Sequence, residues 1–283
     1  MTTDLPAQQQ DWPGSTAELN PRADHGEDSW TGRDRLVGKR ALVTGGDSGI
    51  GRAVALAFAR EGADVAFSHL PEEQADADRT AALVRGEGRR VVVVPGDLRT
   101  HEANVDLARA ALDALGGVDV LVCNAAFQMT HDAVEAFPPE QVERTFATNV
   151  FSPFWLVREL AEELARNRGN VLVTTSVQAY QPSDHLLDYA ATKAALNNLV
   201  ANLAQELGPR GVRVNAVAPG PIWTPLIPAT MAPEKVEGFG SDTPLGRPGQ
   251  PVEVAAAFVF LASDEASYVS GSVLGVTGGK PVF

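Results

Sequence analysis

A tyrosine and a lysine, Tyr189 and Lys193, stand four residues apart in a stretch that is typical of a helix. At that spacing the two side chains share one face of the helix, one turn apart. A phenol can give a proton to an oxygen that gains negative charge, but its ordinary pKa of about 10 hinders cycling near neutrality. A nearby ammonium stabilises the phenolate and lowers that pKa. The pair predicts proton transfer at a substrate oxygen, although the same spacing also occurs between ordinary surface neighbours.

A serine at the end of a β-rich run is the third candidate for this chemistry. The run Val171–Ser176 (VLVTTS) has the composition of a buried strand, which places Ser176 at the strand's carboxyl end. Ligands bind at that edge of a parallel sheet. The Ser176 hydroxyl can there hydrogen-bond a substrate oxygen and steady developing charge. The alternative is a hydroxyl that caps a turn, and the neighbouring Thr175 is a weaker candidate because it should point to the opposite face.

A glycine-rich turn (GGDSGIG) lies between the β-rich run Arg40–Thr44 and a helical pattern. Gly45 can turn the chain sharply, Gly49 lets the backbone approach a pyrophosphate, and Gly51 lets the helix pack close to the sheet. Free N–H groups at the helix N-terminus then face the phosphates. Because strand, turn and helix coincide, the sequence predicts dinucleotide binding. The residues expected to hold the cofactor here are Gly45, Asp47, Ser48, Gly49, Ile50 and Gly51.

Short β-rich runs alternate with longer helical patterns from Gly38 onward. Runs such as VVVV in Arg90–Pro95 lack in–out alternation, which indicates strands covered on both faces, as in a parallel sheet. The alternation predicts an α/β fold, a single doubly wound Rossmann-type domain with a mostly parallel seven-stranded sheet. The expected strands are Arg40–Thr44, Asp64–Ser68, Arg90–Pro95, Val118–Cys123, Val171–Ser176, Val212–Ala218 and Val273–Val276, and the expected helices include Ile50–Glu61, Glu72–Gly86 and one that begins near Leu187.

The spacing of the glycines resembles that of a known family. The segment 44–51 is similar to the Thr-Gly-x-x-x-Gly-x-Gly fingerprint of the short-chain dehydrogenase/reductase family, and the later motifs follow in the family's order. The stretches GGDSGIGRA, SVQAYQPS and DYAATKAA look closest to a bacterial subgroup of NAD(P)-dependent aldehyde reductases and glucose-dehydrogenase-like proteins with an N-terminal extension. The resemblance implies hydride transfer between NAD(P)(H) and a carbonyl or alcohol, such as an aldehyde, ketone, sugar or polyol.

The resemblance implies a catalytic tetrad of Asn149, Ser176, Tyr189 and Lys193. Ser176 lies thirteen residues before Tyr189, the separation typical of the family. Asn149, in a helical pattern, would hold a water that links the lysine to bulk solvent. The alternative for Asn149 is a structural amide that bridges a helix and a strand.

Further cofactor contacts are also implied by the resemblance. Asp97 and Leu98, after the third strand, would contact the adenine. Asn124 and Ala125 stand at the family's Asn-Ala-Gly position, where the third residue is here Ala126, whose methyl group would narrow the groove. The segment 219–224 (PGPIWT) resembles the family's Pro-Gly-x-x-x-Thr, so the Ile222 backbone would meet the nicotinamide carboxamide and Thr224 would bond the carboxamide or a phosphate. These expected contacts are Asp97, Leu98, Asn124, Ala125, Pro219, Gly220, Ile222 and Thr224, together with Tyr189 and Lys193.

The end of the second strand decides between the two nicotinamide cofactors. A carboxylate there accepts a hydrogen bond from the ribose 2′-hydroxyl and repels a 2′-phosphate. This chain has Ser68 and His69 at that point, which permits NADP, and either side chain could contact the phosphate. No arginine stands there to clamp a phosphate, and Glu72 and Glu73 would weakly oppose one. The sequence therefore favours NADP, with NAD as the alternative.

Substrate choice is expected to come from the residues after Ser176, above all Gln178 and Tyr180, and from the proline-rich stretch 225–243, which has the composition of a mobile lid. His185 is expected to be a solvated polar residue at a helix start rather than a base. No group of histidine, cysteine and acidic residues has the spacing of metal ligands, so we expect no metal.

Composition limits the other functions. The formal net charge of −13 argues against a nucleic-acid partner, because such binding needs a basic face. The single cysteine, Cys123, allows no internal disulfide and fits a cytoplasmic setting. No apolar run approaches the roughly 20 residues that span a bilayer, and the N-terminus has neither the basic region nor the apolar core of a secretory signal.

Residues 1–37 form an extension rich in Gln, Asp, Pro and Gly, which is either a disordered tail or an arm that docks Trp12 and Trp30 on the body or on a neighbouring subunit. The domain proper is then 38–283. The family implies a homotetramer, to which the apolar end Tyr268–Phe283 could contribute. The alternatives to an active reductase are a catalytically silent dinucleotide sensor or scaffold, and a lyase or epimerase that uses the cofactor without net redox.

Overall fold

The computed structural model describes residues 5–282 and confirms the α/β expectation. Residues 1–4 of the predicted extension and Phe283 of the apolar C-terminal segment lie outside the described residues. All six strand pairings of the sheet are parallel, in the order β3-β2-β1-β4-β5-β6-β7. The strands are β1 (Arg40–Val43), β2 (Asp64–His69), β3 (Val91–Pro95), β4 (Val120–Cys123), β5 (Asn170–Thr174), β6 (Arg213–Pro219) and β7 (Val273–Val276).

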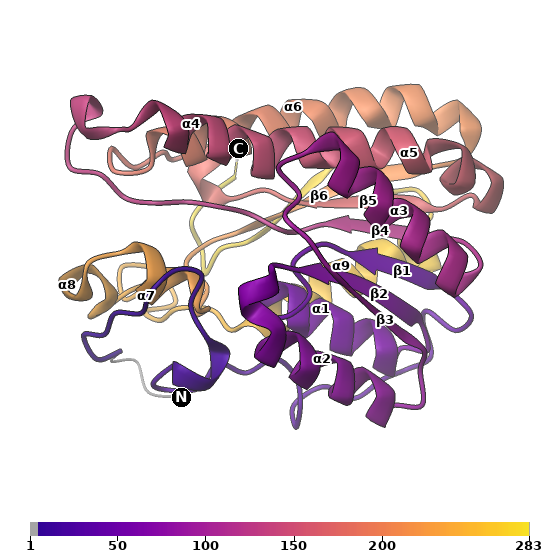
Figure 1. Cartoon of the computed structure of the whole chain (residues 1–283), viewed down its shortest axis with the longest axis horizontal. Coiled ribbons are helices and arrows are strands. Elements are labelled where there is room, and N and C mark those ends of the chain that lie inside the picture. Colours follow the sequence, from indigo (N-terminus) through magenta and orange to yellow (C-terminus); the bar gives the residue numbers. More distant parts are fainter. Residues whose placement is uncertain (1–4, 283) are drawn as a thin grey trace.

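Helices cover both faces of the sheet (Figure 1). Most predicted boundaries agree with the structure to within two residues, the usual uncertainty at element ends. The helices are α1 (Gly49–Arg60), α2 (Gln74–Gly86), α3 (His101–Leu115), α4 (Pro139–Phe146), α5 (Ser152–Asn167), α6 (Leu187–Leu207), α7 (Leu226–Thr230), α8 (Pro233–Val236) and α9 (Pro251–Ala262). Short 3-10 turns cover Thr16–Glu18, Pro71–Glu73, Val134–Ala136, Val177–Ala179, Gly208–Arg210 and Asp264–Ala266, and Ala147–Phe151 is a π-helical turn.

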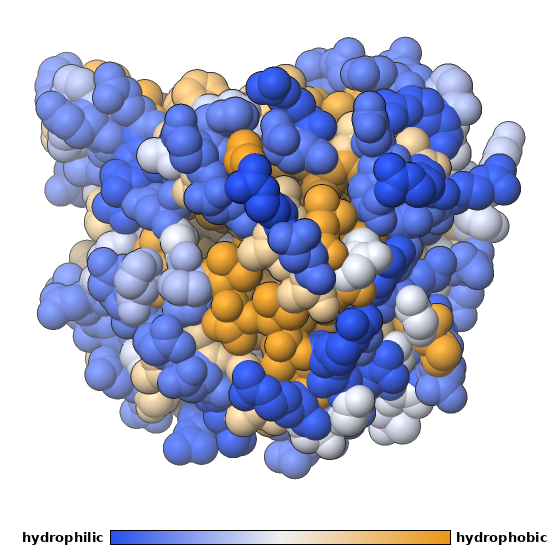
Figure 2. Space-filling view, turned by 45° about the vertical axis from the view of Figure 1, so that its right-hand side comes forward, coloured by the Kyte–Doolittle hydropathy of each residue, from blue (hydrophilic) through white to orange (hydrophobic). Residues whose placement is uncertain are grey.

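Two hydrophobic cores lie on opposite faces of the sheet. Successive strand residues alternate between them: Val43 and Phe67 pack with α1, α2 and α9, whereas Leu42 and Ala66 pack with α3, α5 and α6. Because both faces are covered, the strands need no polar face, which explains their continuous apolar runs. The edge strand β3 is only half-buried. On the face of the molecule seen in Figure 2, hydrophobic residues also reach the surface in the middle, surrounded by mainly hydrophilic residues.

Residues 5–37 of the N-terminal extension run along the body of the protein. Leu5 and Leu19 are buried in a third apolar cluster with Trp223 from the segment after β6. The Trp223 indole Nε1 donates a 2.7 Å hydrogen bond to the Pro21 carbonyl. Trp30 donates to Glu61 at the end of α1 at 3.2 Å. Residues 5–37 therefore lie against the domain at several points along their length.

No helix among residues 5–282 is long and apolar enough to cross a membrane.

Candidate active site

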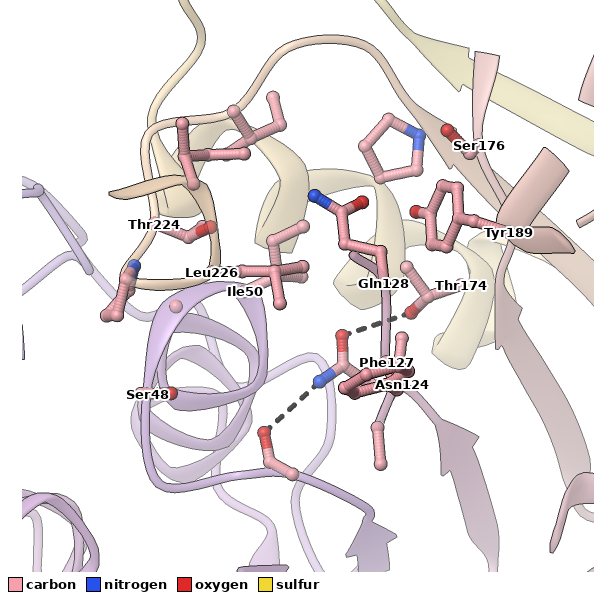
Figure 3. A pocket seen from close by; sticks show the side chains of 18 of the residues that line it. Ser48, Ile50, Asn124, Phe127, Gln128, Thr174, Ser176, Tyr189, Thr224 and Leu226 are labelled. Carbon is pink, nitrogen blue, oxygen red and sulfur yellow. Dashed lines mark hydrogen bonds between the residues drawn. The ribbon is translucent and has the colours of Figure 1, made fainter. Parts of the chain in front are cut away.

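A cleft of about 620 Å³ opens where the strands end. It is lined by the turns after β1, β2, β3, β4, β5 and β6 and by the α7–α8 segment. Strands β2 and β3 follow β1 on one side of it, and strands β4 to β7 follow on the other side. The strand order therefore changes direction between β1 and β4. Doubly wound folds bind ligands at such a switch point. Figure 3 shows side chains from both halves of the sheet pointing into this space.

The glycine turn at one end of the cleft fits a dinucleotide. Gly45 and Gly49 have φ values of +62° and +48°, which residues other than glycine rarely adopt. A Cβ on Gly51 would lie 1.8 Å from the Gly45 carbonyl oxygen, so glycine lets α1 begin directly against the turn. Backbone at the start of α1 is thereby exposed to the cleft, where a phosphate can be held.

Two buried polar atoms beside this turn have no hydrogen-bond partner within residues 5–282. They are Asp47 Oδ2 and His69 Nε2, and both residues line the cleft. Buried polar atoms are normally satisfied, so these two are suited to a polar ligand. The residues present therefore fit a dinucleotide.

Asn124, at the end of β4, braces three parts of the sheet edge. Its Nδ2 donates to the carbonyls of Thr44 and Gly45, each at 3.1 Å, and its Oδ1 accepts from the Thr174 hydroxyl at 3.1 Å (Figure 3). The turn that would hold the cofactor is thus tied to the end of β5. Asn124 would therefore act on a bound cofactor by shaping the backbone of the glycine turn.

Tyr189 and Lys193 lie on the face of α6 that borders the cleft. Lys193 is 1% exposed, and its Nζ lies 5.2 Å from the centre of the Tyr189 ring and donates to the Thr174 carbonyl at 2.8 Å. Burial lowers the pKa of Lys193 to about 7. Tyr189 is half-buried, and loss of contact with water raises its pKa to about 12, while a hydrogen bond with Ser176 works in the opposite direction.

Ser176 follows β5, which ends at Thr174, and faces Tyr189 across the cleft (Figure 3). Its hydroxyl accepts from the Gln178 backbone N–H at 3.1 Å, so it also caps the short turn Val177–Ala179. The structure therefore shows the turn-capping contact that is one of the two interpretations of Ser176, and its contact with a substrate oxygen stays a prediction. The Thr175 hydroxyl instead lies 3.3 Å from the Val217 carbonyl, to which it donates.

Asn149 lies in the π-helical turn between α4 and α5 and is 1% exposed. Its Oδ1 accepts from the Phe127 N–H at 2.8 Å, and its Nδ2 donates to the Phe127 carbonyl and to the Thr192 hydroxyl, each at 3.0 Å. The Thr192 hydroxyl in turn donates to the Tyr189 carbonyl at 2.7 Å. Asn149 therefore connects the loop after β4 to the helix that carries Tyr189, and π-helical turns of this kind often occur at functional sites.

Comparisons with known proteins identify the family of this chain. A family model described as enoyl-(acyl carrier protein) reductase matches residues 45–280. The uncharacterized oxidoreductase YhxD of Bacillus subtilis is 48% identical over 282 residues, covering 98% of this chain and 94% of that protein. This chain belongs to the short-chain dehydrogenase/reductase family.

Two further members of the family support the assignment. A glucose and ribitol dehydrogenase homolog of rice (Oryza sativa subsp. japonica) is 43% identical over 288 residues, covering 97% of this chain and 96% of that protein. The crystal structure of a short-chain dehydrogenase from Burkholderia cenocepacia in complex with NADP superposes with a TM-score of 0.81 at 33% identity, covering 87% of this chain and 99% of that one. The chain is an NAD(P)-dependent oxidoreductase of this family.

Most residues expected at a short-chain dehydrogenase/reductase site line the cleft. Three exceptions are Gly51, which packs beneath the turn, Asn149, which lies behind Phe127, and Tyr180, which is half-buried outside the cleft. The expected residues that line it are Gly45, Asp47, Ser48, Gly49, Ile50, Ser68, His69, Asp97, Leu98, Asn124, Ala125, Ser176, Gln178, Tyr189, Lys193, Pro219, Gly220, Ile222 and Thr224.

The structure also shows where Ser68, His185 and Cys123 lie. The Ser68 hydroxyl accepts from the Gly45 N–H at 3.2 Å and supports the glycine turn. His185 lies outside the cleft lining, with its Nδ1 3.3 Å from the His131 carbonyl. Cys123 is buried, and burial raises the pKa of its thiol to about 12, which makes it an inert apolar side chain. Among residues 5–282 the structure has no group of three or more histidine, cysteine, aspartate or glutamate side chains arranged to hold a metal ion, and the absence of a metal stays a prediction.

Arg144 comes from α4 and also lines the cleft, and no sequence motif predicts it there. Its guanidinium lies 4.1 Å from the Phe127 ring centre and 5.2 Å from that of Trp12. Trp12 itself packs edge-on against Phe127 with ring centres 4.9 Å apart. An arginine in an amphipathic helix has no local motif that marks it, because only the packing of α4 and the extension brings these three side chains together.

Proposed function

We propose that this short-chain dehydrogenase/reductase transfers a hydride between NAD(P)(H) and a carbonyl or alcohol substrate, with Tyr189 as the acid–base residue. The observation that carries the proposal is that Tyr189, Lys193 and Ser176 border the same cleft as the glycine turn. A bound nicotinamide cofactor supplies the hydride or accepts it. The protein must then hold the substrate oxygen and give or take the accompanying proton.

Tyr189 donates the proton when a carbonyl is reduced and accepts it when an alcohol is oxidised. Burial disfavours both the phenolate of Tyr189 and the ammonium of Lys193 when each stands alone. Together, phenolate and ammonium stabilise each other, so the two groups titrate as a coupled pair. The charged lysine therefore favours loss of the Tyr189 proton, which makes proton cycling possible near neutral pH.

Ser176 orients the substrate oxygen, and Asn149 serves the proton path. The Ser176 hydroxyl faces Tyr189, so an oxygen bound between them meets two hydroxyl groups (Figure 3). The Asn149 Oδ1 accepts one N–H and retains a second lone pair for a water. In this proposal that water links Lys193 to solvent. Because Asn149 also bonds Thr192, it holds the helix that carries Tyr189 in place.

The remaining cofactor residues surround the same cleft. Ile222 and Thr224, after β6, would hold the carboxamide of the nicotinamide, and Pro219 and Gly220 shape that turn. A Cβ on Gly220 would lie 2.8 Å from Thr277 backbone atoms, so the turn packs directly on the segment after β7. Asp97 and Leu98 lie at the adenine end.

We propose aldehydes, ketones, sugars and polyols as the substrate classes. The rice relative is a glucose and ribitol dehydrogenase homolog, which favours sugars and polyols. Gln128 and Gln178 present amide groups at the cleft, and amides can bond hydroxyl groups. Met231 and Phe239, from the segment after β6, provide apolar cover on the other side.

A panel of aldehydes, ketones, sugars and polyols tests the proposal. Absorbance of the reduced nicotinamide is followed with NADH, NADPH and their oxidised forms, while cofactor binding is measured separately. Turnover with at least one member is expected. Binding of cofactor without turnover across a broad panel would contradict the proposal and favour a sensor or scaffold.

The extension 1–37 is proposed to act as a docking arm that covers the cofactor cleft. The Gln10 N–H donates to the Pro228 carbonyl of α7 at 2.9 Å, and the Thr16 N–H donates to the Asp76 carboxylate of α2 at 2.9 Å. Between these anchors, Trp12 and Pro13 line the cleft. The arm thus crosses from one wall of the cleft to the other.

A homotetramer is the proposed assembly. Phe151 and Phe154 are 46% and 53% exposed near the start of α5, which follows β4 in the chain. Tyr268, in the segment before β7, is fully exposed. Exposed aromatic groups of this size favour burial against another subunit. Light scattering on the full chain and on a Phe154→Glu variant tests this, since the charge should weaken an interface at α5.

A further inference from the structure

The glycine turn and the end of β2 form one continuous wall of the cleft. The Gly46 N–H donates to the Ser68 carbonyl at 3.0 Å, which brings Asp47 beside His69. Both side chains are 2% exposed. The Asp47 carbonyl accepts from Arg52 Nε and from the Thr80 hydroxyl, each at 2.8 Å, so the loop is fixed from behind.

The unpartnered atoms on this wall are acceptors. Asp47 contributes Oδ2 of its carboxyl group. His69 Nδ1 lies 2.8 Å from the Leu70 carbonyl, and because a carbonyl only accepts, the hydrogen must be on Nδ1. In the neutral ring Nε2 is then an acceptor. These atoms can receive hydrogen bonds from hydroxyl groups, but they offer none to a phosphate.

Glu73 adds a second carboxyl group to the same wall. Its Oε2 accepts from the Leu70 N–H at 3.0 Å, and the residue lines the cleft. Burial, and then the charge of Asp47, raise the pKa of Glu73. A site that disfavours the charge of its own carboxyl group also resists an added dianion. The neighbouring Glu72 is exposed and does not line the cleft.

The guanidinium groups of this region are directed elsewhere. Arg52 Nη2 forms its ion pair with Asp76 at 2.7 Å. Arg144 stacks on Phe127. Burial and then the charge of Arg99 lower its pKa, while Asp97 and Glu72 act in the opposite direction. Neither guanidinium group is therefore directed towards the Asp47 and Glu73 carboxyl groups, where it could bind a phosphate.

We propose that Asp47, Glu73 and His69 form an acceptor wall that receives the ribose 2′-hydroxyl of the cofactor and rejects a 2′-phosphate, so that the enzyme prefers NAD(H) to NADP(H). The inference rests on the proposed function, and it reverses the preference that the residues at the end of β2 suggest by themselves. In doubly wound folds the ribose is read at the end of this strand. Here the carboxyl groups come from the glycine turn and from the turn before α2.

Direct binding measurements test the wall independently of turnover. Dissociation constants for NADH and NADPH are measured by nucleotide fluorescence on the full-length wild type, Glu73→Gln, Asp47→Asn, Glu72→Gln and Arg144→Ala, with melting temperatures as a folding check. Glutamine at position 73 keeps an acceptor for the Leu70 N–H while it removes the titratable carboxyl group. The titrations are run at pH 9, because burial and then the charge of Asp47 raise the pKa of Glu73 to about 8. Glu72→Gln is the matched control, because it removes the same charge from the adjacent residue outside the cleft.

The wild type is expected to bind NADH at least about tenfold more tightly than NADPH, because like charges brought together cost binding free energy. Glu73→Gln should improve NADPH binding about tenfold relative to NADH, whereas Glu72→Gln should leave the ratio within about twofold. Equal or tighter NADPH binding by the wild type overturns the inference. A loss confined to NADPH in Arg144→Ala would also overturn it, by identifying a phosphate clamp. Failure of both nucleotides to bind would instead count against the proposed function.

Discussion

Lys193 reaches from α6 to the end of β5, where its Nζ donates to the Thr174 carbonyl at 2.8 Å and lies 5.2 Å from the Tyr189 ring centre. The Thr174 hydroxyl donates to Asn124, which holds the glycine turn. The lysine is therefore joined through one threonine to the framework of the cofactor cleft. A change in the position of Lys193 is therefore expected to alter the glycine turn as well.

Tyr189→Phe is expected to abolish turnover, with a loss of at least about 10²–10⁴-fold, because it removes the proton donor and leaves the ring in place. Cofactor affinity should stay within about twofold, because the substituted hydroxyl serves the substrate oxygen. Steady-state kinetics and fluorescence titration measure the two effects. Full activity in the variant would refute the assignment of Tyr189.

Lys193→Met is expected to remove activity and to change how stability depends on pH. Burial lowers the folded-state pKa of Lys193 to about 7 from its ordinary value of 10.5, so folding favours the neutral amine. Between these two values the unfolded chain binds a proton that the folded chain does not. Wild-type stability therefore gains a contribution as pH rises from 7 towards 10, and the cost of burying the lysine is greatest below pH 7.

The measurement is urea unfolding of wild type and Lys193→Met at pH 6.5, 8 and 9.5. The free energy of unfolding of the wild type, relative to the variant, should increase across this series by an amount on the order of 1 kcal/mol per pH unit. Methionine has a similar length and no titratable group, so the comparison isolates the lysine. A difference that does not change with pH would mean that Lys193 keeps its ordinary pKa.

Asn149→Ala is expected to lower both stability and kcat, because the amide joins Phe127 to Thr192. Loss of these buried hydrogen bonds should reduce the free energy of unfolding by about 1–3 kcal/mol. Thr192→Val breaks the Asn149–Thr192 contact but keeps the Asn149 amide. If Asn149 also serves the proton path, its removal should alter the pH profile of kcat, whereas Thr192→Val should alter stability alone. Identical pH profiles in both variants would leave Asn149 with a purely structural role.

Trp12→Ala is expected to weaken cofactor binding about tenfold, because it removes the aromatic group that the arm places at the cleft. Trp30→Ala is the matched control: it removes the same side chain from the same extension, at a site where Trp30 contacts Glu61 and Arg35 away from the cleft. Titration of both variants with NADH measures the effect. Unchanged affinity in Trp12→Ala would restrict the arm to a structural role.

Much of the fold follows from local sequence pattern. The continuous apolar runs predicted a parallel sheet, and all seven strands occur where expected with small differences at their ends. Glycines 45, 49 and 51 predicted a turn that only glycine can form at the start of α1. Tyr189 and Lys193 share a helix, so their relationship was visible from spacing. These features depend on residues that are close in the chain, and periodicity and backbone sterics determine them directly.

Tertiary structure decided what residues far apart in the chain do together. Asp47, His69 and Glu73 line one wall because hydrogen bonds join the glycine turn to the end of β2, and the pattern at β2 alone pointed towards NADP. Trp12 and Arg144 meet over Phe127 only after the extension has crossed the cleft and α4 has packed beside it. The sequence by itself determined the sheet, the glycine turn and the placing of Tyr189 and Lys193 on one face of a helix. The charge of the acceptor wall and the cover of the cleft depend on long-range packing and burial, for which no local pattern exists.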